Sequence, residues 1–397
     1  MYIKRKYWIE SLEKISKSFR LICISGPRQI GKSTFLRDCG NYFSFDDPNL
    51  RNAIKEDPVF WLKNEFKKDK RIILDEATRV PEIFEAMKIV ADENPKINGK
   101  IWFASSSNYL LSKRIKESLA GRVFNFKCSQ FLLSEISGCE NPSFIKWLKN
   151  EEISENFFDK DRIIESSLKY SLFPDPYISK DEDFSKMWLN QYLATYVLQD
   201  IVEGFSKIDI SKWQEFMHTF VSYPASIMPL NSLSNILGIH HNTVAEYIKI
   251  ANASLLTINL PVYSKSAIKR LTKGPKYIIT DSTLCKSLNN ETEKGLLFEN
   301  LIISQIINLL NARLISHKAY HYRTADHAEV DLVLETDFGI FPIEIKSAKN
   351  ITNKMSSGIK SFFEAHPKVK RGAIFYNGSK VSKISNIDIL PVSMLFM

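Results

Sequence analysis

Residues 21–36 read LICISGPRQIGKSTFL, and this stretch decides how the first part of the chain folds. The short apolar run before Gly26 is rich in β-branched residues and predicts a buried strand. The pattern after Gly31 suits a helix. Between strand and helix stands the full G-x-x-x-x-G-K-[ST] phosphate-loop motif, which ends in Lys32 and Ser33.

Each position of this loop has a chemical role in holding a nucleotide. Glycines let backbone N–H groups curl around phosphate oxygens, and the following helix presents its positive end to the same anion. Lys32 is expected to reach the β- and γ-phosphates as a catalytic group, and the Ser33 hydroxyl is expected to ligate Mg²⁺. The sequence therefore predicts a site for ATP and Mg²⁺. Its nucleotide-binding residues are Gly26, Pro27, Arg28, Gln29, Ile30, Gly31, Lys32, Ser33 and Thr34.

Length and composition limit the number of domains and the class of partner that we expect. At 397 residues the chain is longer than one hydrophobic core normally serves, so two or three domains are expected. The hydrophobic share of 44% is ample for packed cores. The formal net charge of +9 and the pI near 9.0 suit a polyanionic partner such as nucleic acid, or an anionic membrane surface. The charge is spread along the chain, so on its own it is a weak indication.

The cysteines and the chain's apolar runs predict the compartment. The five cysteines are scattered and form no C-x-x-C pair, which favours reduced thiols and argues against a zinc site. The N-terminus lacks the apolar stretch of a signal peptide. We also expect no window with the ~18 apolar residues of a membrane-spanning helix. These features predict a cytoplasmic protein without a membrane partner.

A second nucleotide-site element follows about forty residues after the phosphate loop. Residues 71–76 (RIILDE) predict an apolar strand that ends in two acids. Asp75 is expected to hold Mg²⁺ through its water shell, and Glu76 to orient or deprotonate the attacking water. The same pattern alone is common, but its place after a complete phosphate loop makes it a strong indication.

Residues 100–107 (KIWFASSS) predict a further strand that ends in hydroxyl groups. One of Ser105, Ser106 and Ser107 is a candidate sensor of the γ-phosphate. The alternative is that these serines cap the next helix. In either case the strand tip is expected to lie beside the phosphate loop.

Two arginines, Arg114 and Arg122, lie just beyond this strand. Arg122 is the catalytic candidate that would stabilise charge at the nucleotide of a neighbouring subunit. That role implies a homo-oligomer. The alternative is a solvated arginine on a helix face, which is the more usual explanation for such a residue.

Five stretches together resemble the AAA+-type predicted ATPases of bacteria and archaea. They read GPRQIGKST, FSFDDPNLRNAIKEDPVFWL, RIILDEATRVPEIFEAMK, ASSSNYLLS and ESLAGRVFNFKCSQFLLSE. The resemblance covers nearly the whole chain and implies an ATPase whose C-terminal region, of unknown function, opens at YLATYVLQDI. Thr78 departs from the family's usual glutamine, which is expected to weaken coupling between Glu76 and bound ligand. Residues 171–174 (SLFP) replace a small-residue turn, which is expected to affect only packing.

The middle of the chain predicts helices and a winged helix. Residues 143–168 and 184–205 show helical periodicity, and residues 230–263 have the spacing of a helix-turn-helix motif with its turn at Gly238. Asn242 or Thr243 is expected to cap the second helix, whose exposed start would suit a DNA major groove. The alternative is a module for protein contact or an ATPase lid. The basic residues expected in a wing are Lys265, Lys269, Arg270, Lys273 and Lys276.

The C-terminal stretches AEVDLVLE and IFPIEIKS flank a turn and predict an antiparallel hairpin. Closing that turn pairs Glu335 with Ile340 and places Asp331 opposite Glu344, with Lys346 on the same face. Opposed carboxylates are unfavourable without a counter-charge, so a divalent metal or Lys346 is expected beside them. The apolar residues expected to face one core are Val330, Leu332, Leu334, Ile343 and Ile345.

This acid, hairpin, acid-x-Lys arrangement resembles the PD-(D/E)-x-K nuclease fold, although the proline before the aspartate is absent. The resemblance implies a catalytic set of Glu299, Asp331, Glu344 and Lys346. In it, Asp331 and Glu344 would hold Mg²⁺, and Lys346 would polarise the scissile phosphate. The alternative is a retained fold that binds DNA without cutting it.

Together these patterns predict an α/β protein of four parts. They are an AAA+-type P-loop NTPase domain (1–140), a helical linker or lid (141–215), a winged-helix-like module (216–285) and an α/β restriction-endonuclease-like domain (286–397). The favoured function is ATP hydrolysis with Mg²⁺, coupled to binding or processing of DNA or another nucleic acid. One alternative is a nucleotide-switched scaffold whose C-terminal region binds a protein partner. The other is a metal-dependent nuclease whose ATPase regulates access.

Overall fold

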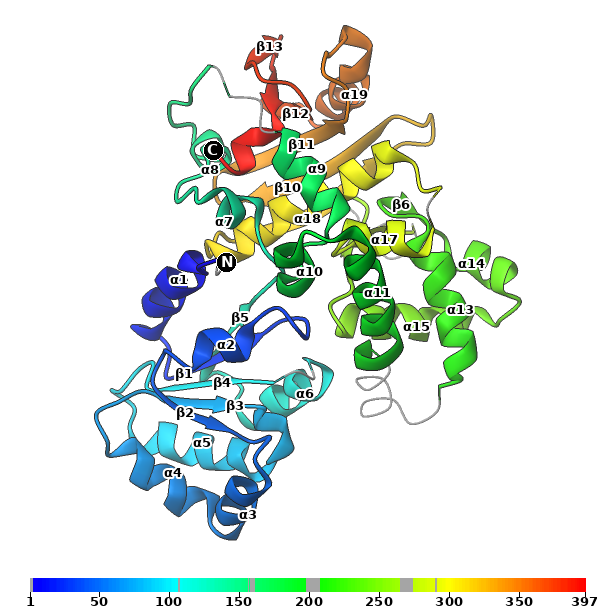
Figure 1. Ribbon diagram of the computed structural model, residues 1–397. Helices are drawn as coiled ribbons and strands as arrows, with labels where there is room; N and C mark the ends of the chain where they lie inside the picture. Colours follow the sequence, from blue (N-terminus) through cyan, green and yellow to red (C-terminus); the bar gives the residue numbers. More distant parts are fainter. Residues whose placement is uncertain are drawn as a thin grey trace.

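The structure is a computed structural model that describes residues 3–105, 108–155, 157, 161–197, 208–264, 274–289 and 291–397. Its strands form a five-stranded, a three-stranded and a six-stranded sheet. In Figure 1 the five-stranded sheet lies at one end of the molecule and the six-stranded sheet at the other. Residues 208–264 form a lobe to one side, and helix α18 (Lys294–Ala312) lies beside the six-stranded sheet.

The strands of the five-stranded sheet all run parallel, in the order β2-β3-β4-β1-β5. The central strands β1, β3 and β4 are buried at every residue, as apolar strands covered on both faces must be. The register pairs Ser25 with Lys127 and Ser44 with Asp75, so these strands end at one edge. The strands are β1 (Leu21–Ser25), β2 (Asn41–Ser44), β3 (Ile72–Asp75), β4 (Ile101–Ala104) and β5 (Val123–Lys127).

Helices cover both faces of this sheet, and two short helices, α3 and α4, follow each other within residues 48–66. An aspartate-proline step begins each of the two. Asp47 and Asp57 each accept a backbone N–H bond of 2.8 Å from the first turn that follows, and proline fixes the first helical position. The helices are α1 (Lys6–Ser16), α2 (Lys32–Leu36), α3 (Pro48–Glu56), α4 (Pro58–Phe66), η1 (Ala77–Arg79), α5 (Glu82–Glu93) and α6 (Asn108–Ser118).

The expected helix over residues 143–168 is wrong, because the chain leaves the helical path after Leu148. Asn150 takes a left-handed backbone (φ 60°), and residues 151–154 are not helical. Among the described residues, the next helix is α9 (Asp161–Lys169). Within 184–205 the part that the structure describes is helical as far as Val197. The elements are α7 (Leu133–Ser137), α8 (Ser143–Leu148), α9 (Asp161–Lys169), α10 (Pro174–Ser179), α11 (Glu182–Tyr192) and the π-helical turn η2 (Leu193–Val197).

The predicted helix, turn and helix of residues 230–253 are confirmed. Gly238 ends the first helix in a left-handed conformation (φ +61°) that favours glycine. The predicted cap is wrong: the His240 ring, rather than Asn242 or Thr243, accepts the N–H of Asn242 at 3.3 Å. The antiparallel sheet beside these helices has the order β6-β8-β7. The elements are α13 (Ile210–Val221), β6 (Ser226–Ile227), α14 (Leu230–Leu237), α15 (His241–Ala253), β7 (Thr257–Leu260), β8 (Lys276–Ile279) and α17 (Ser282–Leu288).

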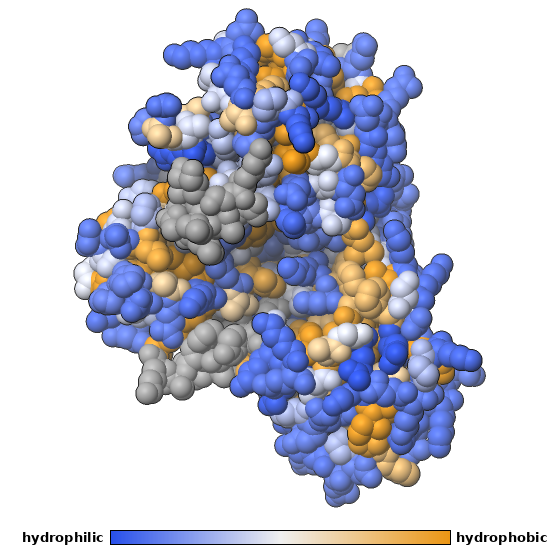
Figure 2. All heavy atoms as spheres, turned by 180° about the vertical axis from the view of Figure 1, so that it is seen from behind, coloured by the Kyte–Doolittle hydropathy of each residue, from blue (hydrophilic) through white to orange (hydrophobic). Residues whose placement is uncertain are grey.

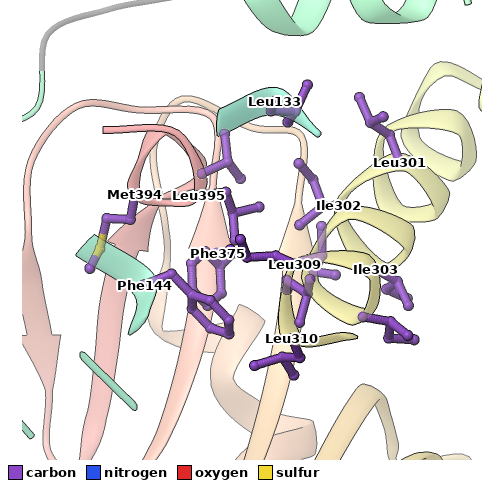
Figure 3. Close-up of a cluster of buried hydrophobic side chains, with 14 of the residues drawn as sticks. Leu133, Phe144, Leu301, Ile302, Ile303, Leu309, Leu310, Phe375, Met394 and Leu395 are labelled. Carbon is purple, nitrogen blue, oxygen red and sulfur yellow. The ribbon is translucent and has the colours of Figure 1, made fainter. Parts of the chain in front are cut away.

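The C-terminal sheet is mixed, in the order β13-β14-β12-β11-β10-β9. One face packs on α18, and Figure 3 shows Ile302, Leu309 and Leu310 of this helix among Phe375, Leu395 and Phe144. Helix α19 contacts β10 and β11 and covers the opposite face. The elements are β9 (His317–Arg323), β10 (Glu329–Thr336), β11 (Gly339–Lys346), η3 (Asn353–Ser356), α19 (Ser357–Ala365), β12 (Gly372–Tyr376), β13 (Ser382–Ile384), β14 (Ile387–Pro391) and η4 (Val392–Leu395).

Helix α18 corrects the expectation that no window is apolar enough to span a membrane. By length and hydropathy, Lys294–Ala312 passes that test among the described residues, but 72% of its most apolar window is buried within the protein. Its apolar surface therefore serves as the core of the C-terminal domain. The face drawn in Figure 2 is mostly hydrophilic, with apolar side chains in separate patches. The cytoplasmic location stays a prediction.

Asp281 joins segments that lie far apart in the sequence. Its carboxylate accepts the backbone N–H groups of Thr283 (2.8 Å) and Leu284 (3.3 Å), and so caps α17. The same carboxylate accepts the Ser171 hydroxyl at 2.6 Å and the Leu172 N–H at 2.9 Å, in the turn before α10. It is 1% exposed, and burial raises its pKa. Four hydrogen bonds offset the cost of burying this acid.

Replacing Asp281 tests this junction. Asp281→Ala leaves buried donors without an acceptor and is expected to lower the free energy of unfolding by about 3 kcal/mol. Asp47→Ala, at an exposed helix cap, should cost only about 1 kcal/mol. Urea unfolding followed by circular dichroism measures both losses. Equal losses in the two variants would show that the bonds to Ser171 and Leu172 add nothing to stability.

Candidate nucleotide-binding site

The phosphate loop leaves β1 at Ser25 and enters α2 at Lys32. Gly31 stands at the start of the helix with φ +88°, a left-handed conformation that favours glycine. At Gly26 a Cβ would lie 2.7 Å from Ile30 Cδ1 and 2.8 Å from the Cys128 carbonyl oxygen, too close for any side chain. The two glycines of the motif are thus required by the backbone path itself.

Lys32 is held inside the loop. Its Nζ donates to the carbonyl oxygens of Gly26 (2.8 Å) and Pro27 (2.7 Å), and the residue is 7% exposed. Burial lowers the pKa of this ammonium, opposed first by the charge of Glu76. Lys32 also lines a pocket, so an anion bound there would meet this ammonium and the N–H groups of the loop.

A pocket of about 400 Å³ opens on this loop. Its walls come from the phosphate loop, from Glu76 directly after β3, and from the first turn of α10. Phosphate-loop side chains make up most of the wall, which suits an anionic ligand. The lining residues are Arg28, Gln29, Gly31, Lys32, Ser33, Thr34, Glu76, Pro174 and Asp175.

Asp75 lies at the end of β3, beside β2 of the same sheet. Tyr42 Oη donates to its Oδ2 at 2.6 Å, and the N–H of Glu76 donates to its Oδ1 at 3.1 Å. Burial, followed by the contact with Asp75, raises the pKa of Tyr42 to about 12. The tyrosine thus stays a donor and fixes the carboxylate. Its carboxylate oxygens are of the ligand type that Mg²⁺ prefers.

Glu76 has a left-handed backbone (φ 55°, ψ 40°), which is uncommon for a residue other than glycine. The turn directs its carboxylate to the tip of β4, where Ser105 Oγ donates to Oε2 at 3.4 Å. Ser105 Oγ also lies 2.5 Å from Thr78 Oγ1. The Thr78 hydroxyl therefore belongs to the same hydrogen-bond network as Glu76. Ser106 and Ser107 lie outside the described residues.

Arg122 lies just before β5, at the opposite ends of the strands, where its carbonyl accepts the N–H of Leu21. Its guanidinium makes two bonds to Asp92, Nε to Oδ1 at 2.7 Å and Nη2 to Oδ2 at 2.8 Å. Arg114 lies 3.6 Å from Glu117 on its own helix. The role of Arg122 at a neighbouring nucleotide stays a prediction, and it would require the pair with Asp92 to open.

Asp175 is a pocket residue that sequence reasoning missed. It stands between two prolines, directly after the segment 171–174 that was expected to affect only packing, and no spacing signal marks it. The structure instead places Pro174 and Asp175 at the mouth of the nucleotide pocket. The turn just before them is fastened to Asp281. The middle region therefore reaches the pocket directly.

The C-terminal hairpin has the predicted register, since Glu335 pairs with Ile340. Lys346 Nζ lies 2.6 Å from Glu344 Oε2 and 3.5 Å from Asp331 Oδ2, so the predicted counter-charge is confirmed.

Val330 is the exception among the five apolar hairpin residues that were expected to face one core. It packs on the α19 side, apart from Leu332, Leu334, Ile343 and Ile345, because the pairing of β9 with β10 shifts between Val330 and Val333. This bulge breaks the strict alternation.

Lys276 joins the same acids. Expected in a basic wing, it is instead 1% exposed, and its Nζ lies 2.5 Å from Glu299 Oε1, 3.3 Å from Asp331 Oδ1 and 3.7 Å from Glu329 Oε1. Burial and the charge of Asp331 raise the pKa of Glu299 to about 7. Burial would raise the pKa of Asp331 as well, but the charges of Lys276 and Lys346 hold it at about 2. The metal-binding role of Asp331 and Glu344 stays a prediction.

Comparisons with known proteins agree with the first of these sites. The family model of an AAA domain matches residues 18–137. Two domains of unknown function follow, DUF8612 over residues 163–295 and DUF4143 over 294–395. An uncharacterized protein of Mycobacterium tuberculosis is 23% identical over 393 residues, which cover 95% of this chain and 81% of that protein. One of Methanocaldococcus jannaschii is 24% identical over 331 residues, with 78% and 71% covered.

Solved structures give only distant similarity. A RuvB variant of Thermotoga maritima is 15% identical with a TM-score of 0.27, over 68% of this chain and 94% of that one. A DNA replication initiation factor is 16% identical with a TM-score of 0.22, over 72% and 93%.

Lys32→Ala tests the nucleotide site. It removes charge-assisted contacts to phosphate worth about 3 kcal/mol, so ATP affinity should fall about 100-fold or more. Lys286→Ala, in an exposed ion pair with Glu182, is the control and should bind ATP normally. Isothermal titration calorimetry gives both constants. A Lys32→Ala variant that binds ATP like the parent would refute the assignment of this loop.

Ser105→Ala tests the contact that positions Glu76. We expect kcat for ATP hydrolysis to fall about tenfold with ATP affinity unchanged, because the hydroxyl orients the base and not the nucleotide. Ser118→Ala is matched to it, since Ser118 also donates to a glutamate, Glu85, but at the surface. Steady-state ATPase assays separate kcat from KM. A change confined to KM would place Ser105 in binding instead.

The glycine geometry, the pocket and the domain match agree with one another. The loop of residues 26–33 has the backbone path that the motif requires, and Glu76, directly after β3, lines the pocket that opens on the loop. The matched region 18–137 contains all of these residues. Residues 18–137 therefore form an AAA-type P-loop ATPase domain, the part of this protein that binds and hydrolyses ATP.

Proposed function

We propose that this protein is an Mg²⁺-dependent ATPase that couples ATP hydrolysis to the binding of DNA or another nucleic acid. The observation that carries the proposal is the pocket in which the phosphate loop, Glu76 and Asp175 face one another. ATP in this pocket would contact the AAA domain and the middle region at once. A change from ATP to ADP would therefore alter contacts outside the AAA domain.

The proposal assigns tasks to residues in the pocket and beside it. Lys32 binds the β- and γ-phosphates, exchanging its bonds to the loop carbonyls for bonds to phosphate oxygens. Ser33 and Asp75 would hold Mg²⁺, which supplies charge neutralisation at the phosphates when bound. Glu76 orients or deprotonates the attacking water, and Ser105 keeps its carboxylate at the strand tip. Asp175 faces the nucleotide from the other wall.

The middle region supports the nucleic-acid part of the proposal. The elements α13, β6, α14, α15, β7 and β8 follow in the order of a winged helix, with the strands in one antiparallel sheet. In helix-turn-helix proteins the second helix of the motif enters the major groove. The first turn of α15 exposes His241 and Asn242, and Lys249 is exposed two turns later. The net charge of +9 favours a polyanion as partner.

One part of the expected DNA surface is not available. Lys276, expected in the wing, is buried among carboxylates and cannot contact phosphate. The other basic wing residues, within 265–273, lie outside the described residues. DNA contact is therefore proposed through the start of α15.

A second candidate function is a nucleotide-switched scaffold that binds a protein. It is favoured by Ile236, which is 63% exposed on α14, next to the proposed nucleic-acid helix. An exposed apolar side chain on such a module is more useful at a protein interface than against a phosphate backbone. The same experiment separates the two candidates.

The test is the ATPase rate with Mg²⁺, titrated with single- and double-stranded DNA and with RNA. We expect several-fold stimulation by one of them, lost in Glu76→Gln and weakened by raising the salt from 50 to 200 mM, as phosphate contacts require. A rate indifferent to every nucleic acid, yet lost in Glu76→Gln, would refute the coupling and leave the scaffold.

A matched pair of variants localises the contact. Asn242→Ala, at the exposed start of α15, is expected to raise the nucleic-acid concentration needed for half-stimulation about tenfold, with the basal ATPase rate unchanged. Asn49→Ala, an equally exposed asparagine on α3, should leave both quantities unchanged. Fluorescence anisotropy with a labelled oligonucleotide gives the affinity directly. Equal affinities of the two variants would show that the nucleic acid does not bind at the start of α15.

A further inference from the structure

The acidic cluster of the C-terminal domain holds a cation that comes from outside that domain. The cluster consists of Glu299 on α18, Glu329 and Asp331 on β10, and Glu344 on β11. The Nζ of Lys276 lies within 4 Å of three of these carboxylates, and the side chain is 2% exposed. The lysine is therefore a central member of the cluster.

Lys276 belongs to the sheet of the middle region. It is the first residue of β8 and pairs with Leu260 of β7 and Ile227 of β6. The neighbouring contacts keep β8 against the C-terminal domain: the Asn300 side chain accepts the N–H of Ile279 at 2.8 Å and donates to its carbonyl oxygen at 2.7 Å. Glu299 and Asn300, which are adjacent on α18, thus both fasten β8 to this helix.

Asp331 lies between two ammonium groups. Its Oδ1 is 3.3 Å from Lys276 Nζ, and its Oδ2 is 3.5 Å from Lys346 Nζ. The same Oδ2 also accepts the backbone N–H of Ile345 at 2.9 Å. The oxygens of this aspartate are thus directed at donors of the chain itself.

The nuclease-fold resemblance implies a divalent metal here, and the residues as arranged do not fit one. Mg²⁺ needs several oxygen ligands at about 2.1 Å around one point, which must be free of other cations. The ammonium of Lys276 occupies the space between Glu299 and Asp331 and carries three donors of its own. A metal on the same oxygens would meet a like charge at close range.

We propose that Lys276 acts as an internal counter-cation that fastens β8 to the C-terminal domain and closes the acidic cluster to divalent metal. The cluster becomes a metal site only when the ammonium leaves it. This inference stands on the lysine's position alone and is independent of how the ATPase is used.

The proposal gives the lysine a signature that a merely packed side chain would lack. Without its ammonium, the acids repel one another and destabilise the fold, as expected when one partner of a buried ion pair is removed. A divalent cation that binds the vacated oxygens would restore stability, because it binds the folded state only. Stability of a Lys276 variant should therefore depend on metal, and stability of the parent should not.

The experiment uses the full chain without nucleotide and Mn²⁺ as the probe. Electron paramagnetic resonance measures bound Mn²⁺, and thermal unfolding is followed with and without 1 mM Mn²⁺. We expect Lys276→Met to bind one Mn²⁺ at least tenfold more tightly than the parent and to gain several degrees in Tm on adding it. The double variant Lys276→Met with Asp331→Asn should lose both effects. Lys286→Met, which breaks an exposed ion pair with Glu182, should behave as the parent.

Two results would overturn the proposal. One is a folded Lys276→Met variant that binds no more Mn²⁺ than the parent. The other is a parent protein that already binds Mn²⁺ tightly at a site that Asp331→Asn removes. If Lys276→Met does not fold, the Mn²⁺ binding of the parent is compared with that of Asp331→Asn, and this comparison tests the proposal. Equal Mn²⁺ binding by the two then supports the closed cluster.

Discussion

The parallel pairing of β1, β3 and β4 is the constraint on which the nucleotide site depends. Parallel neighbours end at the same edge of a sheet, so the loop after each strand is brought to one place. The phosphate loop, Asp75 with Glu76, and Ser105 meet there although helices separate them in sequence. A shift of β3 by one residue would move Asp75 about 3.3 Å along the strand and turn it to the other face. The carboxylate would then lose Tyr42.

Asp281 connects the region beside the nucleotide pocket to the rest of the molecule. Its carboxylate fixes the turn before α10, and α10 presents Asp175 to the nucleotide pocket. The same residue caps α17, directly after β8, whose Lys276 is held in the C-terminal domain. The path from nucleotide to C-terminal domain is thus short and made of buried hydrogen bonds and ion pairs.

Local rules were enough where the interacting residues are near in sequence. The phosphate loop, the strand before Asp75 and the hairpin register at Glu335 each depend on residues a few positions apart, and all could be predicted. The roles of Asp175 and Lys276 could not, because their partners come from distant segments that only the folded chain brings together. The break after Leu148 and the bulge at Val330 were missed for a related reason. Periodicity shows which face is apolar, but it does not show where packing interrupts an element.

A lysine in a basic stretch of sequence is most simply interpreted as solvated. At Lys276 the surroundings reverse that interpretation, because a buried ammonium needs carboxylates and a buried group of carboxylates needs a cation. A buried ammonium or a buried group of carboxylates is unfavourable alone. Where the middle region meets the C-terminal domain, the ammonium of Lys276 pairs with the carboxylates of Glu299 and Asp331, and the pairing offsets both costs. Acids spaced as in a nuclease can therefore be retained for the contact between domains. The spacing of the acids predicts where a cation lies. Whether that cation is a metal or a lysine depends on the rest of the fold.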